Sequence, residues 1–357
     1  MNELLKMSEG AAVFCASQEE DFFTLLKEMA KTDLWLTCDA EKIRMHAEED
    51  ALFIELAEGR RYGLFPQAVK SIFRRAGAEG AAFERLSAEE CEKVLNIFWP
   101  HAKGCCKALV RAGLVLALHS QRYIPFRQQS LFESFRRILE GKYETAVFAG
   151  ASFSQEKTTA EYEVIEERLL FAYSLALRKA GISAAEDIRA FAEMSTSDCG
   201  TSSVTIVPSL SLNHSERVYI APPVLIAHRD DKTFESCEAE MEKVFAAMTD
   251  GIRNMERLLK IELTYPSSIA IKLAKSSRWD LPGKLIKELH SEFMIPEMMG
   301  MTMTAHQFYM TLCEMLSSEK FEALSPLRKL RVREILLKIA LLDEAEWQKL
   351  DNNDISW

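Results

Sequence analysis

The sequence is short of glycine, proline and long apolar runs, and each shortage excludes a class of protein. With 14 glycines and 10 prolines among 357 residues, it is neither fibrous nor of low complexity. No run approaches the ~20 apolar residues that span a bilayer, so we expect no membrane helix and no membrane partner. The hydrophobic share of 48% is too high for a disordered chain. These limits leave a folded globular protein.

Familiar catalytic motifs are also missing. The chain contains no GxxxxGK phosphate-binding loop, no HExxH and no GxSxG. Gly77 and Gly80 do not lie between a predicted strand and a predicted helix, as a phosphate-binding loop would require. Because each of these motifs allows little variation, their absence is informative. We therefore lean against an enzyme and expect no cofactor.

The cysteines and the first residues bear on the compartment. There are 8 cysteines at scattered positions with no CxxC pair. The opening residues MNELLKMSEG lack a basic region followed by an apolar one, so no secretory signal is expected. The sequence predicts a cytoplasmic protein of a bacterial host with reduced thiols, most of them small buried hydrophobes.

The charge balance limits the partners. The chain carries 44 Lys and Arg against 54 Asp and Glu, a formal net charge of −10. A charge of this sign disfavours non-specific adhesion to nucleic acid or to anionic membranes. It does not exclude a local basic face.

Apolar spacing predicts where helices and strands lie. Helices are expected at 20–31, 66–77, 88–99, 163–179, 183–192 and 234–259, with a last one from 326. Strands are expected as two within 33–56 and one each at 108–120, 144–153 and 201–212, with an edge strand at 218–228 interrupted by Pro222-Pro223.

The order of these elements predicts an α+β fold. Strands are interspersed with helices without regular βαβ alternation, which favours a mixed, largely antiparallel sheet flanked by helices. The last third is mainly helical. We expect an α+β core over 1–230 and a helical region over 231–357 packed on it, with one undivided domain as the alternative. The apolar seam of 234–259 predicts packing on the sheet, and a homotypic coiled coil is the other possibility.

The segment MSTSDCGTSS at 194–203 is the most unusual in composition. An exposed Cys199 beside backbone donors would suit a nucleophile, with His214 or His228 as its base. Asp198 and Gly200 instead favour a turn in which hydroxyl groups satisfy the loop amides. We prefer the turn, because nothing in the sequence places a base near the thiol.

A second segment, 101–137, is basic. It holds seven Lys and Arg residues against one acid, Glu133, with aromatic side chains among them. Arginines interleaved with aromatics can hold phosphates and stack bases. The candidates for nucleic-acid binding are Lys103, Lys107, Arg111, Arg122, Tyr123 and Arg127. A solvated or ion-paired face is the plainer interpretation.

The same segment contains His101, Cys105 and Cys106. If this stretch were helical, His101 and Cys105 would share a face and could supply two zinc ligands. Two ligands do not close a tetrahedral site, and no second pair lies at a suitable spacing. We expect no metal.

Residues 50–260 resemble a known family. YGLFPQAVKSIFRRAG, LVRAG and LALHSQRYIPFRQQSLFESF within 62–135, TSDCGTSSVTIVPSL at 196–210 and HRDDKTFE at 228–235 carry the likeness. They are similar to a family of uncharacterised phage- and plasmid-related proteins catalogued as domain of unknown function 932. The element from Leu118 to Tyr123 is one residue longer than the usual form. The resemblance implies a mobile-element origin and an α+β fold, and it assigns no catalytic residues.

Two functions follow as hypotheses. The first is a phage-, prophage- or plasmid-encoded accessory or counter-defence protein, which binds a protein of a host or phage nucleic-acid machine. Its acidic surface would complement the basic grooves of such enzymes. The alternative is single-stranded nucleic-acid binding or processing through 101–137.

Overall fold

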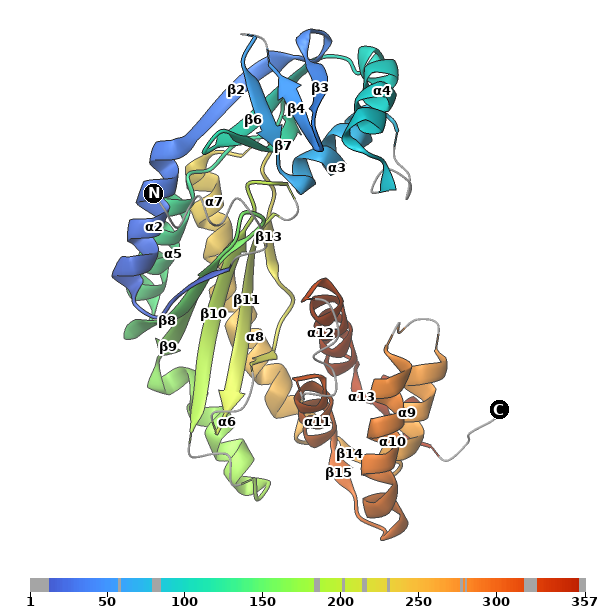
Figure 1. The fold of residues 1–357 in the computed structure, drawn as a ribbon. Helices are drawn as coiled ribbons and strands as arrows, with labels where there is room; N and C mark the ends of the chain where they lie inside the picture. Colours follow the sequence, from blue (N-terminus) through green and yellow to red (C-terminus); the bar gives the residue numbers. More distant parts are fainter. Residues whose placement is uncertain are drawn as a thin grey trace.

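The computed structural model describes residues 13–56, 59–78, 85–182, 187–200, 203–213, 217–229, 232–276, 279, 281–317 and 326–352. These residues form two large sheets with flanking helices, and a group of C-terminal helices with a two-stranded sheet (Figure 1). The α+β fold, with largely antiparallel sheets flanked by helices and a helical C-terminal region, is confirmed.

The larger sheet has seven antiparallel strands in the order β1-β8-β9-β10-β11-β12, with β13 also beside β11. Its strands are β1 (Phe14–Ala16), β8 (Thr145–Phe153), β9 (Thr158–Ile165), β10 (Ile188–Thr196), β11 (Val204–Leu212), β12 (Val218–Tyr219) and β13 (Val224–Ile226). Along β9, buried Tyr162 and Val164 alternate with the partly exposed Glu161 and Glu163. One face of the sheet therefore carries the apolar core.

Helices cover that face (Figure 1). They are α2 (Glu19–Thr32), α5 (Gln128–Lys142), α7 (Phe234–Met241) and α8 (Lys243–Leu258), with α6 (Glu167–Lys179) near the lower end. The predicted long helix is thus two segments separated at Glu242. Its seam, from Cys237 to Met255, is buried in the core of the larger sheet, which confirms the packing expected from the sequence.

The smaller sheet lies at the top of the view in Figure 1. It has six strands in the order β2-β6-β7-β5-β4-β3, and only the β5–β7 pair is parallel. The strands are β2 (Asp33–Asp39), β3 (Arg44–Glu48), β4 (Ala51–Glu55), β5 (Arg61–Leu64), β6 (Cys105–Arg111) and β7 (Leu114–Ser120). Helices α3 (Pro66–Arg75) and α4 (Ala88–Phe98) complete its separate apolar core. Ser87 and Glu90 form the predicted capping box of α4.

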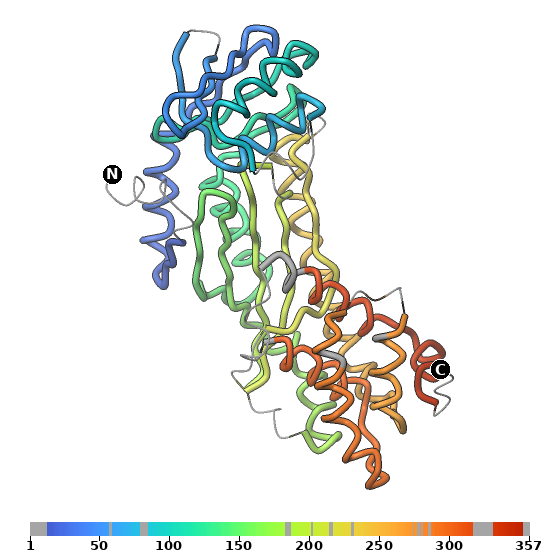
Figure 2. The backbone as a smooth tube through the Cα atoms, turned by 45° about the vertical axis from the view of Figure 1, so that its right-hand side comes forward, coloured from blue at the N-terminus to red at the C-terminus, as the bar shows by residue number. Residues whose placement is uncertain are grey.

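The C-terminal helices pack at the opposite end of the larger sheet, as the turned view in Figure 2 also shows. They are α9 (Pro266–Lys275), α10 (Gly283–Met298), α11 (Ala305–Ser317), α12 (Pro326–Ala340) and α13 (Glu344–Leu350), with a small ladder of β14 (Glu262–Leu263) and β15 (Met303–Thr304). Their apolar side chains belong to the same core as those of the larger sheet. The division near residue 230 stays a prediction.

Four sequence predictions need correction. The single strand at 108–120 is a hairpin of β6 and β7, because Ala112 and Gly113 both have positive φ, as a two-residue turn of this kind requires. The two strands within 33–56 are three, β2, β3 and β4.

The other two corrections concern helices. The predicted helix at 163–179 begins only at Glu167, since its first residues end β9. The predicted helix at 183–192 has its capping box outside the described residues, and the part from Ile188 is β10. There Ala190, Ala192 and Met194 face the core with period two, and this tertiary packing outweighs the helical propensity of alanine.

The predicted interruption of the strand at 218–228 is confirmed. Pro222 and Pro223 separate β12 from β13, and both short strands pair with β11. Pro208, inside β11, falls between these two pairings. A residue without an N–H is tolerated there because the ladder is already broken.

Candidate functional site

The residues singled out by sequence gather where the two sheets meet. Asp198, Cys199 and Gly200 form a turn after β10, as predicted, and Gly200 has a φ of 71°. The Cys199 side chain is buried, and its Sγ–H donates to the Gln155 carbonyl at 2.9 Å. Burial raises the pKa of this thiol to about 12. At neutral pH Cys199 is therefore a protonated thiol, which does not suit a nucleophile.

Of the two suggested bases, the structure describes only His228. His214 lies outside the described residues. His228 is held elsewhere: its Nδ1 lies 3.1 Å from the Ile124 carbonyl, and its ring stacks on Tyr123 with centroids 5.0 Å apart. Burial lowers the pKa of His228. The observed contacts are those of a structural turn.

Arg111 is buried between two carboxylates. Its Nε lies 2.6 Å from Asp33 Oδ1, and its Nη2 lies 3.3 Å from Asp198 Oδ2. Gln128 also donates to Asp198 Oδ2. Burial raises the pKa of Asp198 to about 6, although Arg111 opposes the shift. Only 2% of Arg111 is exposed, so it is not presented to a phosphate in solution.

Tyr123 is buried in a ring stack at the same junction. The ring of His119 stacks on it with centroids 3.8 Å apart, and the ring of His228 stacks on it at 5.0 Å. His119 Nε2 donates to the Asp198 carbonyl at 2.7 Å, and burial lowers the pKa of His119 to about 4. Tyr123 is 8% exposed, so it offers no open stacking surface to a base.

The remaining basic candidates are divided. Lys107 donates to the Tyr123 carbonyl at 2.7 Å, whereas Lys103, Arg122 and Arg127 are exposed.

His101 and Cys105, considered as a pair of zinc ligands, do not share a helix face: His101 ends a short 3-10 turn and Cys105 begins β6. Cys105 instead donates to Asp39 at 3.2 Å. No cluster of three or more potential metal ligands occurs among the residues that the structure describes.

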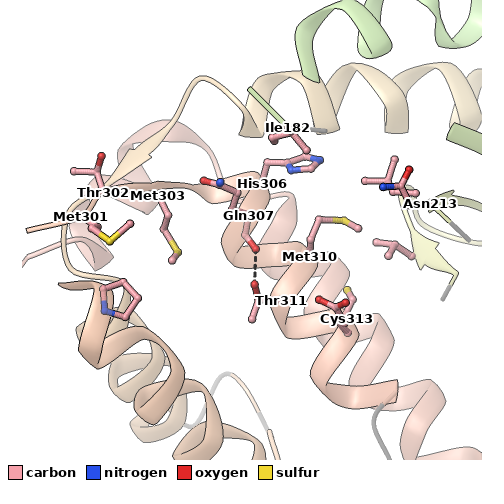
Figure 3. Close-up of a pocket in the computed structure, with 14 residues that line it drawn as sticks. Ile182, Asn213, Met301, Thr302, Met303, His306, Gln307, Met310, Thr311 and Cys313 are labelled. Atoms are coloured by element: carbon pink, nitrogen blue, oxygen red, sulfur yellow. Dashed lines mark hydrogen bonds between the residues drawn. The ribbon is translucent and has the colours of Figure 1, made fainter. Parts of the chain in front are cut away.

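A pocket between the larger sheet and the C-terminal helices is the strongest candidate site (Figure 3). Its cavity volume is about 590 Å³, within the range of small-molecule sites. It is lined by Ile182, Leu212, Asn213, Val218, Pro296, Met301, Thr302, Met303, His306, Gln307, Met310, Thr311, Cys313 and Glu314. The lining comes from the residue Ile182 after α6, the end of β11, Val218 of β12, the stretch from Pro296 of α10 to Met303 of β15, and one side of α11. We call this cavity the methionine pocket, after Met301, Met303 and Met310.

The buried polar group of the methionine pocket is His306, which is 1% exposed. Its Nε2 lies 2.6 Å from the hydroxyl of Tyr173 on α6. Its Nδ1 has no hydrogen-bond partner among the described residues. Burial lowers the pKa of His306 to about 4, so the imidazole is neutral at pH 7.

Exposed apolar side chains continue from the pocket to the end of α10. We call them the methionine tip: Met294, Ile295, Met298, Met299 and Met301, which are 41%, 63%, 80%, 72% and 56% exposed. Met301 belongs to both the tip and the methionine pocket. Contiguous exposed apolar groups of this kind mark interaction sites on soluble proteins.

This site was not predicted from the sequence, although the sequence contains a signal for it. Five of the chain's 15 methionines fall within 294–303, in the run MIPEMMGMTM. Six of the ten residues of that run are Met or Ile, which is more than one buried helix face holds. His306 carried no signal, since only the fold brings it to Tyr173.

Comparison with protein-family models, with curated proteins and with solved structures finds no match to this chain. The resemblance to the family of domain of unknown function 932 therefore stays a prediction. No helix in the described part of the chain is both long and apolar enough to cross a membrane.

Proposed function

We propose that this chain is a binding protein, and that the methionine tip and methionine pocket hold an apolar segment of a partner protein. The observation that carries the proposal is the continuity of the exposed tip with a cavity of about 590 Å³. An anchor side chain of the partner fills the cavity and its neighbours cover the tip. Methionine side chains suit this role because they are flexible and polarisable.

Charge indicates what surrounds the partner's apolar residues. Residues 291–314 contain Glu292, Glu297 and Glu314 and no Lys or Arg. The carboxyl end of α10, which carries a partial negative charge, lies at the tip. The partner segment should therefore carry Lys or Arg beside its apolar anchors. The same acidity disfavours an anionic lipid surface as the occupant.

The sequence suggests the class of partner, and that suggestion is part of this proposal. A cytoplasmic accessory or counter-defence protein of a phage, prophage or plasmid would bind a component of a nucleic-acid machine. Such components commonly carry the basic residues that an acidic site attracts. Direct binding of single strands through 101–137 gains no support from the positions of Arg111, Lys107 and Tyr123.

A defined peptide tests the binding mode. The probe is a fluorescent 14-residue helix of leucine and lysine with all leucines on one face, compared with a scrambled peptide of the same composition. We expect saturable binding of the amphipathic peptide alone. Met298→Asp with Met299→Asp should weaken it at least ~10-fold, because each lost anchor costs on the order of 1 kcal/mol. Both residues are exposed, so the fold should be unaffected.

Phe171→Asp supplies the matched control, since Phe171 is 70% exposed on α6 and lies outside the tip. It should leave peptide binding unchanged. Equal binding of both peptides, or equal loss in control and tip variants, would contradict the proposal. Vesicles of anionic lipid that bind the wild type but not the tip variant would identify a membrane as the occupant instead.

A capture experiment tests the partner class. Wild-type, tip-variant and control proteins are each used to capture proteins from bacterial lysate, with and without nuclease. We expect a protein that is retained by the wild type and the Phe171→Asp control, lost from the tip variant, and insensitive to nuclease. Retention that disappears with nuclease would favour the nucleic-acid alternative.

A further inference from the structure

The methionine pocket contains one buried polar group whose hydrogen-bonding capacity is unused. Gln307 Oε1 accepts from the Thr304 backbone N–H at 2.8 Å, and the Thr311 hydroxyl donates to the Gln307 carbonyl at 3.0 Å. His306 Nδ1 differs, because no described residue bonds to it. A buried polar atom without a partner destabilises the folded state, because it has lost its hydrogen bond to water. Such an atom beside a cavity points to a guest that satisfies it.

The neighbouring phenol determines which hydrogen-bonding role Nδ1 plays. Tyr173 is fully buried, and among the described residues its hydroxyl contacts His306 Nε2. If Tyr173 donates to Nε2, the phenol is satisfied and the neutral ring carries its hydrogen on Nδ1. If Nε2–H donated to the phenol oxygen, the phenol hydrogen and Nδ1 would both lack partners. The first arrangement leaves one unsatisfied group and the second leaves two, so Nδ1 is the N–H donor.

We infer that the methionine pocket binds an apolar group that carries a hydrogen-bond acceptor, such as a carbonyl oxygen, and that the Nδ1–H of His306 donates to it. This inference rests on the proposed function and specifies the chemistry of the group that enters the cavity. Nδ1 is buried in this conformation, so the guest must displace a neighbouring side chain to reach it. Met303 and Met310, which line the cavity with flexible thioethers, allow such a movement.

A pair of nearly isosteric probes isolates the acceptor. Acetophenone carries a carbonyl where α-methylstyrene carries a methylene group. Dissociation constants for both are measured by NMR titration of the full chain. For each protein we take the ratio of the dissociation constant of α-methylstyrene to that of acetophenone, so a larger ratio means a stronger preference for the ketone. The ketone loses more hydration free energy on binding in any pocket, and His306→Phe measures the ratio when only this cost acts. We expect the ratio to be roughly 3–10-fold larger in the wild type, the effect of one hydrogen bond.

Tyr173 is a positioning residue in this scheme, and Tyr173→Phe tests it. Without the phenol, nothing fixes the hydrogen on Nδ1, so the ratio should move toward that of His306→Phe while α-methylstyrene binding is kept. Met303→Trp should block both probes by filling the cavity. Leu225→Trp, at an exposed position on β13, should block neither.

One measurement needs no variant near the pocket. The ¹H–¹⁵N spectrum of the histidine rings in the wild type should place His306 Nδ1 among protonated ring nitrogens, and acetophenone should shift it. An unprotonated Nδ1, or equal ratios in wild type and His306→Phe, would overturn the inference and leave the peptide test unaffected. If neither probe binds, or if Met303→Trp and Leu225→Trp behave alike, the pocket is not the site of the guest. The peptide assay on the tip variants decides the proposed function separately.

Discussion

Arg111 and Asp198 form a buried ion pair that joins the two sheets. Arg111 ends β6 of the smaller sheet, Asp198 follows β10 of the larger one, and 3.3 Å separates Nη2 from Oδ2. Asp33 on β2 also pairs with the guanidinium, with Nε to Oδ1 at 2.6 Å and Nη2 to Oδ2 at 2.9 Å. One cation thus compensates two carboxylates, so its loss would leave both unpaired.

Arg111→Met should therefore destabilise the protein strongly. Removing one partner of a buried ion pair typically costs about 3–5 kcal/mol, because a charge stays buried without compensation. Lys103→Met, at an exposed position, should change the free energy of unfolding by less than about 0.5 kcal/mol. Urea unfolding of both variants measures the contrast. Similar changes in the free energy of unfolding for both variants would mean that the ion pairs of Arg111 do not stabilise the contact between the two sheets.

The pKa of Asp198 predicts how stability depends on pH. Burial raises this pKa from 3.8 to about 6, so the folded state holds the proton more tightly than the unfolded state. The resulting stabilisation is fully present below pH ~4 and is lost as the pH rises through about 6. Relative to Asp198→Asn, the wild type should gain up to about 3 kcal/mol between pH 7.5 and pH 4.

His119 opposes this trend and supplies the control. Its pKa falls from 6.5 to about 4, so its contribution is present above pH ~6.5 and is lost as the pH falls toward 4. Relative to His119→Gln, the wild type should lose stability over the same interval. Urea unfolding at several pH values should give differences of opposite sign for the two variants. Parallel curves for both would show that neither group titrates as described.

Gly251 should be intolerant of alanine although it lies inside α8. A Cβ there would meet the Ile220 carbonyl oxygen at 2.8 Å, so helix and backbone would have to separate. A Cβ added at Gly141, inside α5, would meet no atom of the described residues within 4 Å. Gly141→Ala should stabilise by up to about 1 kcal/mol, the usual preference of a helix, whereas Gly251→Ala should destabilise. Thermal melting of the two variants is sufficient to see the opposite signs.

The sequence predicted elements whose signal is local. The capping box at Ser87 and the seam from Cys237 to Met255 rest on short-range spacing, and the structure confirms both. The prediction of a helix up to residue 192 was wrong because the segment from Ile188 is β10, which is buried between β9 and β11. The helical propensity of Ala190 and Ala192 does not reveal this pairing with other strands. The segment 108–120 was expected as a strand of a hairpin, but the turn at Ala112-Gly113 was not predicted, because alanine rarely adopts a positive φ.

The candidate site was predictable only in part. The exposed tip follows from the methionine run at 294–303, but the pocket needs α6 and α11 to meet through Tyr173 and His306, which are 133 residues apart. Arg111 was predicted to be a surface cation because its partner is also distant in the sequence. Its partner Asp198 is 87 residues away, and only the meeting of the two sheets brings the two together.

The thiols should differ sharply in reactivity. Cys15 is exposed, whereas Cys199 is buried with a pKa raised to about 12. A disulfide reagent such as Ellman's should label Cys15 rapidly in the native protein and Cys199 only after unfolding. Cys15→Ser should remove the fast phase, and Cys199→Ala should leave it intact while lowering stability modestly. Rapid native labelling that is lost in Cys199→Ala would revive the nucleophile hypothesis.

Oligonucleotide binding distinguishes the proposed function from its alternative. Of the six basic-segment candidates, Lys103, Arg122 and Arg127 are exposed. If these three contacted phosphates, the log–log salt slope would be roughly −0.7 × 3, or about −2, and affinity would fall ~20-fold between 50 and 200 mM salt. Arg122→Ala with Arg127→Ala would flatten that slope by about 1.4.

We expect instead that the protein does not retain a labelled single strand at low salt. A chain of net charge −10 repels the strand, and Arg111 and Tyr123 are buried. Tight, salt-dependent retention that the double variant weakens would contradict this expectation and favour the alternative.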